Sequence, residues 1–318
     1  MKKNKKPLII GNWKTNPATL DRAKSRFQSI KRSAQEHPGI DVVICPPSPY
    51  IATLVAAANT SNIYVGAQDL SIYAEGAKTG EVGGSMIESV GAKFVIIGHS
   101  ERRAMGETDT LVAQKVTQAL KTSMQVVICI GESERDNDGA YLEVIKNQLK
   151  SALSGVDRPQ FANIVIAYEP VWAIGRKDNI AITSHDLHQM VIYIKKLLKE
   201  WWSDTIALMV PILYGGSATA DNAQDILWNG MVDGLLVGRA SWEVETFGPL
   251  FDAVDAPKKT TILLTKKKPR EDARKEAQIK AKKFAKKKIV KTAAKIVRKA
   301  SKPKKAIKKK KASKKKRQ

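Results

Sequence analysis

Residues 93–130, KFVIIGHSERRAMGETDTLVAQKVTQALKTSMQVVICI, carry the pattern that decides the fold. The apolar runs KFVIIG, from residue 93, and QVVICI, from residue 125, are continuous rather than alternating, which is typical of parallel strands buried on both faces. Between them, LVAQKVTQAL, from residue 111, has its apolar residues at helical spacing. The stretch therefore predicts a strand, a helix and a second, parallel strand.

The same unit recurs along the chain. Six further apolar runs are LIIGNW from residue 8, IDVVIC from 40, NIYVGA from 62, NIVIAY from 163, IALMVPILY from 206 and GLLVG from 234. Helix-period segments lie between runs, for example YLEVIKNQLKSAL from 141 and DLHQMVIYIKKLL from 186. Eight such units over roughly 250 residues favour an α/β (β/α)8 TIM barrel, although doubly wound sheets share the local pattern.

Charge divides the 318 residues into two parts. Residues 258–318 contain 29 Lys or Arg and three acidic residues, which leaves 26 basic and 28 acidic residues for the rest of a chain whose net charge is +24. From about Pro257 the composition falls to Lys, Ala, Ser and a few aliphatic residues, which cannot bury enough apolar surface to fold alone. We predict a TIM-barrel domain over residues 1–255 and a disordered, lysine-rich C-terminal tail over residues 256–318.

Three functions are open for this basic tail. It can be a solvated appendage, an arm that binds nucleic acid without sequence preference, or an attachment to an anionic membrane surface. Phe284 is its only aromatic residue, which argues against specific recognition of single strands by base stacking.

The two cysteines and the N-terminus bear on the compartment. Cys45 and Cys129 lie in apolar, strand-like runs, so a disulfide framework is not expected and a reducing cytoplasm fits best. The N-terminal MKKNKKPLII has too short an apolar stretch for a signal peptide, and no run of 18 apolar residues predicts a transmembrane segment.

Polar residues and glycines follow five of the predicted strands at the same end. These are Asn12 and Lys14 in GNWK, His99 in GHSERR, Glu169 in AYEPVWAIG, the pair Gly215 and Gly216 with Ser217 in YGGS, and Gly238. In a TIM barrel the carboxyl ends of the strands carry the active site, and the loops after strands seven and eight often hold phosphate. We therefore expect these residues to form one site.

The residue types at this end indicate acid–base chemistry. Glu169 is a candidate general base, provided that water is excluded, and the apolar segment between Pro170 and Gly175 could form the lid that excludes it. His99 precedes a predicted helix N-terminus, which disfavours an imidazolium and leaves a neutral ring able to donate a hydrogen bond. Glycines let backbone N–H groups approach an anion closely.

The motifs GNWK, GAQD, TGE, GHSERR, YEPVWAIG and YGGS, in this order and spacing over about residues 7–250, closely resemble the triosephosphate isomerase family. The resemblance implies interconversion of D-glyceraldehyde 3-phosphate and dihydroxyacetone phosphate, as in glycolysis and gluconeogenesis. It implies Glu169 as the base, His99 as the neutral electrophile, Lys14 as the cation that balances the enediolate and phosphate, and Asn12 as a positioning residue. Gly175, Ser217, Gly238 and Arg239 would bind the phosphate.

The resemblance also implies a homodimer and no metal or organic cofactor. In that dimer the loop of residues 71–83, with Thr79 and Glu81, would insert beside the neighbour's Lys14, and Glu101 and Arg102 would support the site. Three departures from the family pattern are the charged stretch of residues 176–180 after AIG, Arg239, where a second glycine is common, and residues 104–107, a stretch one residue shorter than the common form. The alternative function is a catalytically impaired barrel that binds nucleic acid through its tail.

Overall fold

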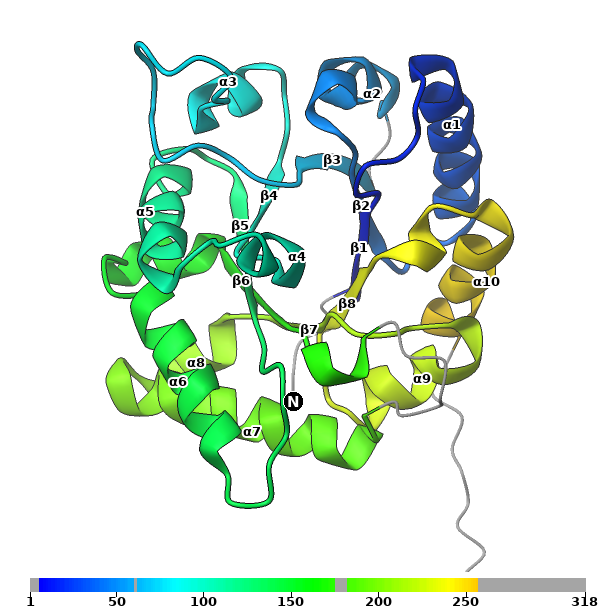
Figure 1. Cartoon of the computed structure of the whole chain (residues 1–318). Helices are drawn as coiled ribbons and strands as arrows, with labels where there is room; N and C mark the ends of the chain where they lie inside the picture. Colours follow the sequence, from blue (N-terminus) through cyan, green and yellow to red (C-terminus); the bar gives the residue numbers. More distant parts are fainter. Residues whose placement is uncertain (1–5, 60–61, 175–181, 257–318) are drawn as a thin grey trace, which may run out of the picture. The chain divides into compact units, whose positions relative to one another are not determined.

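The computed structural model describes residues 6–59, 62–174 and 182–256. Within these ranges, eight parallel strands pair in chain order and β1 also pairs with β8, so the sheet closes into a barrel with helices around it (Figure 1). The TIM-barrel prediction is confirmed, whereas residues 257–318 of the predicted tail lie outside the described residues. None of the helices described is long and apolar enough to cross a membrane.

At least one α-helix separates each strand from the next along the chain. The strands are β1 (Leu8–Asn12), β2 (Asp41–Cys45), β3 (Ile63–Ala67), β4 (Phe94–Ile97), β5 (Gln125–Ile130), β6 (Ile164–Tyr168), β7 (Ile212–Tyr214) and β8 (Gly234–Val237). The helices are α1 (Leu20–Glu36), α2 (Ile51–Ala57), α3 (Gly84–Ser89), α4 (Ser100–Ala104), α5 (Asp109–Ala119), α6 (Ala140–Ala152), α7 (Ser184–Trp201), α8 (Asp204–Met209), α9 (Ala220–Trp228) and α10 (Val244–Asp255).

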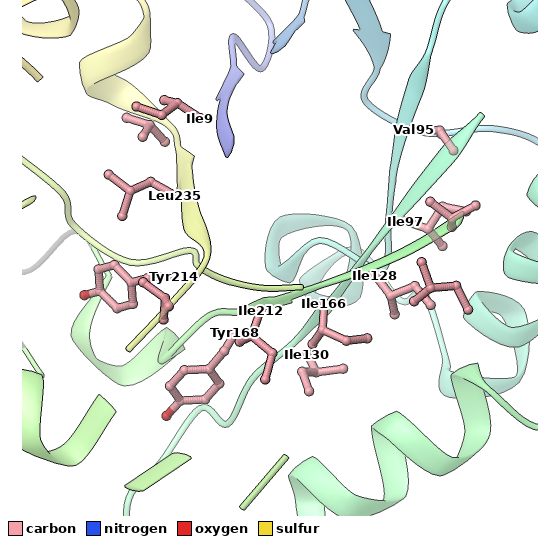
Figure 2. Packing of buried hydrophobic residues seen from close by; sticks show 14 of the residues in the cluster. Ile9, Val95, Ile97, Ile128, Ile130, Ile166, Tyr168, Ile212, Tyr214 and Leu235 are labelled. Carbon is pink, nitrogen blue, oxygen red and sulfur yellow. The ribbon is translucent and has the colours of Figure 1, made fainter. Parts of the chain in front are cut away.

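The strands divide their side chains between two apolar clusters, because successive residues of a strand point to opposite sides of the sheet. In β5, Ile128 belongs to the outer cluster, which packs against the helices, while Val127 and Cys129 belong to a separate inner cluster. Figure 2 shows part of the outer cluster, including Ile128 and Ile166. Both faces of the strands are therefore buried, which explains their continuous apolar runs.

The seventh predicted strand is partly wrong. The run from residue 206 begins inside α8, and only Ile212–Tyr214 form β7. Ser203 caps the helix, since its hydroxyl accepts a hydrogen bond from the N–H of Ile206 at 3.3 Å. Pro211 follows the helix, where it cannot continue the backbone hydrogen bonding. Local capping thus overrides the apolar run.

Candidate active site

The carboxyl ends of the strands meet at one face of the barrel because all strands are parallel. Asn12 is the last residue of β1, His99 follows β4 by two residues, and Glu169 directly follows β6. Asn12, His99 and Glu169 are all buried, at 5%, 8% and 2% exposure. Buried polar groups need partners, so their contacts define the site.

Glu169 and His99 form the centre of this site. The Glu169 Oε1 atom lies 3.1 Å from His99 Nε2, and Oε2 accepts a hydrogen bond from the backbone N–H of Ser100 at 2.9 Å. Burial raises the pKa of the Glu169 carboxyl above its ordinary value, and the neighbouring His99 ring and Ser100 N–H oppose that shift. A carboxylate with a raised pKa is suited to accept a proton near neutral pH.

His99 has its ring fixed by the start of α4. Gly98, at φ +72°, turns the chain after β4, and His99 becomes the N-cap residue of the helix, as the sequence predicts. The backbone N–H of Glu101 donates to His99 Nδ1 at 3.2 Å. Because Nδ1 accepts this bond, the proton of a neutral ring is placed on Nε2, which faces Glu169.

Lys14 lies in the loop after β1, at the same end of the barrel as Glu169 and His99, which we call the barrel mouth. It has a left-handed backbone, φ +52°, which is uncommon for a residue with a side chain and is held by two hydrogen bonds. Its N–H donates to Asn12 Oδ1 at 3.0 Å, and its carbonyl accepts from Gln68 Nε2 at 2.7 Å. The ammonium lies 2.5 Å from Glu101 Oε1. This loop conformation directs a cation to the barrel mouth.

A cavity of about 580 Å³ opens beside these residues. Asn12, Lys14 and His99 line it together with residues 68–73 and 80–82 of the loop after β3. Glu169 does not line this cavity, and its carboxylate instead contacts His99 and Ser100. Gly215 leaves room for Glu169, since a Cβ atom at residue 215 would lie 2.7 Å from Glu169 Cγ.

The candidate phosphate-binding residues differ in their exposure and contacts. Gly238 lies against Lys14, at a distance where a Cβ atom would be 3.3 Å from Lys14 Cε. Ser217 and Arg239 are exposed, and the Ser217 carbonyl accepts a hydrogen bond from Asn222 Nδ2 at 3.1 Å. Gly175, with the charged stretch of residues 176–180, lies outside the described residues. The structure therefore places Gly238 in contact with Lys14 of the site, whereas Ser217 and Arg239 lie on the surface of the protein.

The sequence reasoning missed Glu132, a carboxylate 1% exposed near the site. Its Oε1 accepts hydrogen bonds from the Tyr168 hydroxyl at 2.8 Å and from Trp172 Nε1 at 2.7 Å. Burial raises the pKa of Glu132, and these donors oppose the shift. Glu132 ties the segment that follows Glu169 to the end of β5. The sequence feature that points to Glu132 is its position two residues after a predicted strand.

A second group that the sequence reasoning missed is a buried ionic cluster behind the loop after β3. Lys115, 4% exposed, has its ammonium 2.7 Å from both Asp69 carboxylate oxygens and 2.5 Å from Glu107 Oε1. Arg102 Nε lies 2.8 Å from Asp69 Oδ2 and 3.1 Å from Glu107 Oε1. The cluster connects α4, α5 and the loop that lines the cavity. Its sequence signal was a lysine between Val112 and Val116 on the apolar face of a helix.

Comparisons with known proteins agree with this fold and site. A family model described as Triosephosphate isomerase matches residues 7–254. The triosephosphate isomerase of Rhodopirellula baltica is 39% identical over 248 residues, which cover 77% of this chain and 96% of that protein. The triosephosphate isomerase of Carboxydothermus hydrogenoformans is 39% identical over 245 residues, which cover 76% of this chain and 96% of that protein. That of Moorella thermoacetica is 38% identical over 248 residues, which cover 77% of this chain and 98% of that protein. The chain therefore belongs to the triosephosphate isomerase family.

Proposed function

We propose that this chain interconverts D-glyceraldehyde 3-phosphate and dihydroxyacetone phosphate, the step of glycolysis and gluconeogenesis that the sequence resemblance implies. The observation that carries the proposal is the 3.1 Å contact between Glu169 Oε1 and His99 Nε2, at the barrel mouth that also holds Asn12 and Lys14. A carboxylate base beside a neutral imidazole is the division of roles known for triosephosphate isomerases. A coupled assay of the full chain with D-glyceraldehyde 3-phosphate tests the proposal, because dihydroxyacetone phosphate should form.

The proposed reaction moves one proton between two neighbouring carbons and one between their oxygens, and it leaves the overall oxidation state unchanged. Glu169 takes the proton from the carbon next to the carbonyl, and the electron pair of that bond forms the enediolate. His99 donates a hydrogen bond from Nε2–H to the oxygen on which negative charge develops, and the Lys14 ammonium stabilises the same charge and the phosphate. Asn12 orients the substrate. Returning the first proton to the neighbouring carbon, together with passage of the hydroxyl proton from one oxygen to the other, completes the isomerisation.

Glu169 must change partners before it can act. Its Oε2 accepts from the Ser100 N–H at 2.9 Å, and the carboxylate does not line the cavity. We infer that substrate binding releases Glu169 from Ser100 and brings its carboxylate to the substrate carbon. Gly215 leaves space beside this side chain, since a Cβ atom there would lie 2.7 Å from Glu169 Cγ. Gly175, Ser217, Gly238 and Arg239 are proposed to bind the phosphate, mostly through backbone N–H groups.

The pH dependence of the rate follows from the raised pKa of Glu169. A general base must be ionised, so kcat/KM is expected to fall as pH drops through a free-enzyme pKa above 4.5, the ordinary value for Glu. The measurement is the pH–rate profile between pH 4 and 9, with rates expressed per concentration of substrate dianion to remove the titration of the substrate phosphate. A profile that stays flat down to pH 4.5 would contradict the role of a buried base.

We propose a homodimer in which residues 71–83 of a second copy enter the 580 Å³ cavity. Exposed apolar side chains support this arrangement: Val82 and Tyr73 are each 39% exposed, and Met105, which also lines the cavity, is 75% exposed. Sedimentation equilibrium at micromolar concentration should give twice the mass of the chain. A single-chain mass at that concentration would exclude the dimer as the working state.

The division into a barrel over residues 1–255 and a tail over residues 256–318 is likewise proposed. The last helix of the barrel, α10, ends at Asp255, and the tail carries all of the excess positive charge, because the residues before it contain 26 basic and 28 acidic side chains. A truncation after Asp255 is expected to keep kcat/KM within about twofold of the full chain, because the described site residues all precede that point. Loss of activity or of solubility after truncation would show that the tail is needed by the enzyme.

We also propose that the protein resides in the cytoplasm.

A further inference from the structure

A small depression on the outer side of α1 carries arginines that the isomerase site does not use. Arg22, Ser25, Arg26 and Ser29 of α1 and Trp242, which follows β8, line a cavity of about 170 Å³. We call it the arginine pocket. None of its five residues lines the larger cavity at the barrel mouth. The arginine pocket is therefore a separate feature of the surface.

Spacing along the helix brings these four side chains together. Residues 22, 25, 26 and 29 are three or four positions apart, so they lie on one face of α1. Trp242 packs beneath this face, with the Arg26 guanidinium 4.8 Å and the Arg22 guanidinium 5.9 Å from its ring centroid. Stacking on an aromatic face restricts a guanidinium and leaves its N–H groups free to bind at the edge.

Trp242 is itself held in place. Its ring meets Trp13 edge to face, with 5.7 Å between the ring centroids, and Trp13 is 1% exposed. The Trp13 indole N–H donates to the Ser241 carbonyl at 3.2 Å. The floor of the arginine pocket is thus part of the packed barrel, which preorganises the two guanidinium groups above it.

The carboxylates nearby neutralise these arginines only weakly. Glu245 Oε2 lies 3.6 Å from Arg26 Nη1, but its side chain is 77% exposed, and such pairs contribute little to stability. Asp21, the residue before Arg22, is exposed, and no ion pair of Arg22 is found in the described part of the chain. The lining of the pocket thus consists of two cations, two hydroxyl groups and one indole ring, with no acidic residue.

Hydrogen-bond donors in the pocket point to an anion of several oxygens. Each guanidinium offers five N–H donors in a planar fork that matches phosphate oxygens, and a serine hydroxyl can add another. The Ser29 hydroxyl already accepts from Arg32 Nη2 at 3.2 Å, which brings a third guanidinium to the rim. The cavity admits only a small group, so the remainder of a ligand must lie outside it.

We propose that the arginine pocket binds the phosphate group of a small phosphate ester, at a site distinct from the isomerase centre. Arg22 and Arg26 hold the phosphate oxygens, Ser25 donates a further hydrogen bond, and Trp242 fixes the two guanidinium groups. The proposal does not depend on the isomerase activity, because none of the five residues takes part in the proposed reaction.

The test is a titration of the full chain with inorganic phosphate at constant ionic strength, followed by NMR. Saturable shifts are expected at the Trp242 indole and at the amides of residues 22–29, in addition to shifts at Gly238 from the isomerase site. In Arg22→Gln/Arg26→Gln, the binding that shifts the Trp242 signals should weaken about tenfold or more, as expected when charged hydrogen bonds are lost. The Kd read from Gly238 should stay within about twofold, and this also shows that the variant is folded.

A matched control separates a built site from general attraction. Lys24→Gln/Lys121→Gln removes the same charge from two exposed lysines outside the pocket and should leave phosphate binding at Trp242 within about twofold. If phosphate binding at Trp242 weakened equally in both double variants, the net charge of the protein would explain the effect, and the proposal would be overturned. The absence of any saturable shift at Trp242 in the unmodified chain would also overturn it.

Discussion

Replacing Glu169 with Gln is expected to lower kcat/KM by about 10²–10⁴-fold, the range that a positioned general base contributes. The amide cannot accept the proton, while the site otherwise keeps a side chain of the same shape 2% exposed at the end of β6. KM should change little by comparison, because the lost interaction belongs to the transition state. Steady-state kinetics in both reaction directions measure the effect.

Two companion variants show whether kcat/KM depends on the position of the Glu169 carboxylate and whether the loss of another carboxylate has the same effect. Glu169→Asp keeps the charge but withdraws the carboxylate by roughly 1.5 Å, and a misplacement of that order costs about 10²-fold. Glu134→Gln alters an exposed carboxylate close to Glu132 and should leave kcat/KM unchanged. If Glu169→Gln kept more than about a tenth of the activity, another residue would have to be the base.

Replacing Lys115 with Met is expected to lower the free energy of unfolding by about 3–5 kcal/mol. The change leaves the Glu107 carboxylate, 6% exposed, and Asp69 with Arg102 as their one remaining cation among the described residues. Burial raises the pKa of the Glu107 carboxyl, but the hydrogen bond and charge of Lys115 outweigh this effect and hold the pKa below its ordinary value of 4.5. The stabilisation from this pair is therefore complete above about pH 4.5 and is lost as pH falls through the lower pKa of the folded state.

Urea unfolding at pH 7 measures this loss, with two comparisons. Lys146→Met removes an exposed ion pair to Glu143, 3.0 Å long, and should change the unfolding midpoint little. The double variant Lys115→Met/Glu107→Gln should recover part of the stability, because it removes one of the uncompensated carboxylates. A midpoint for Lys115→Met equal to that of Lys146→Met would mean that the buried cluster does not stabilise the barrel.

The sequence was sufficient for features that depend on one strand or one strand end. Continuous apolar runs predicted the barrel strands because both faces of a barrel strand are buried. Glu169 and His99 could be placed at a common mouth because parallel strands present their carboxyl ends together, and the structure puts their side chains 3.1 Å apart. Helix α8 was missed because its run is as apolar as a strand, and a capping serine decided its conformation.

Contacts between distant elements could not be predicted in the same way. Lys115 meets Asp69 across 46 residues, and Glu132 meets Trp172 across 40. Each pairing exists because two neighbouring parallel strands, β3 and β4 or β5 and β6, bring the segments that follow them together. A charged residue on an apolar helix face indicates a buried partner, but the sequence does not say which one. The arginine pocket, in contrast, depends on closure of the barrel, since α1 meets the segment after β8 where β1 pairs with β8.

The most direct test of the proposed function is the isomerisation of D-glyceraldehyde 3-phosphate by the full chain in a coupled assay that reports dihydroxyacetone phosphate. Turnover that is abolished or strongly reduced in Glu169→Gln is the predicted result, and it would establish Glu169 as the base of an active isomerase. Absence of turnover in the unmodified, folded chain would contradict the account, because the arrangement of Glu169, His99, Lys14 and Asn12 would then not suffice for catalysis.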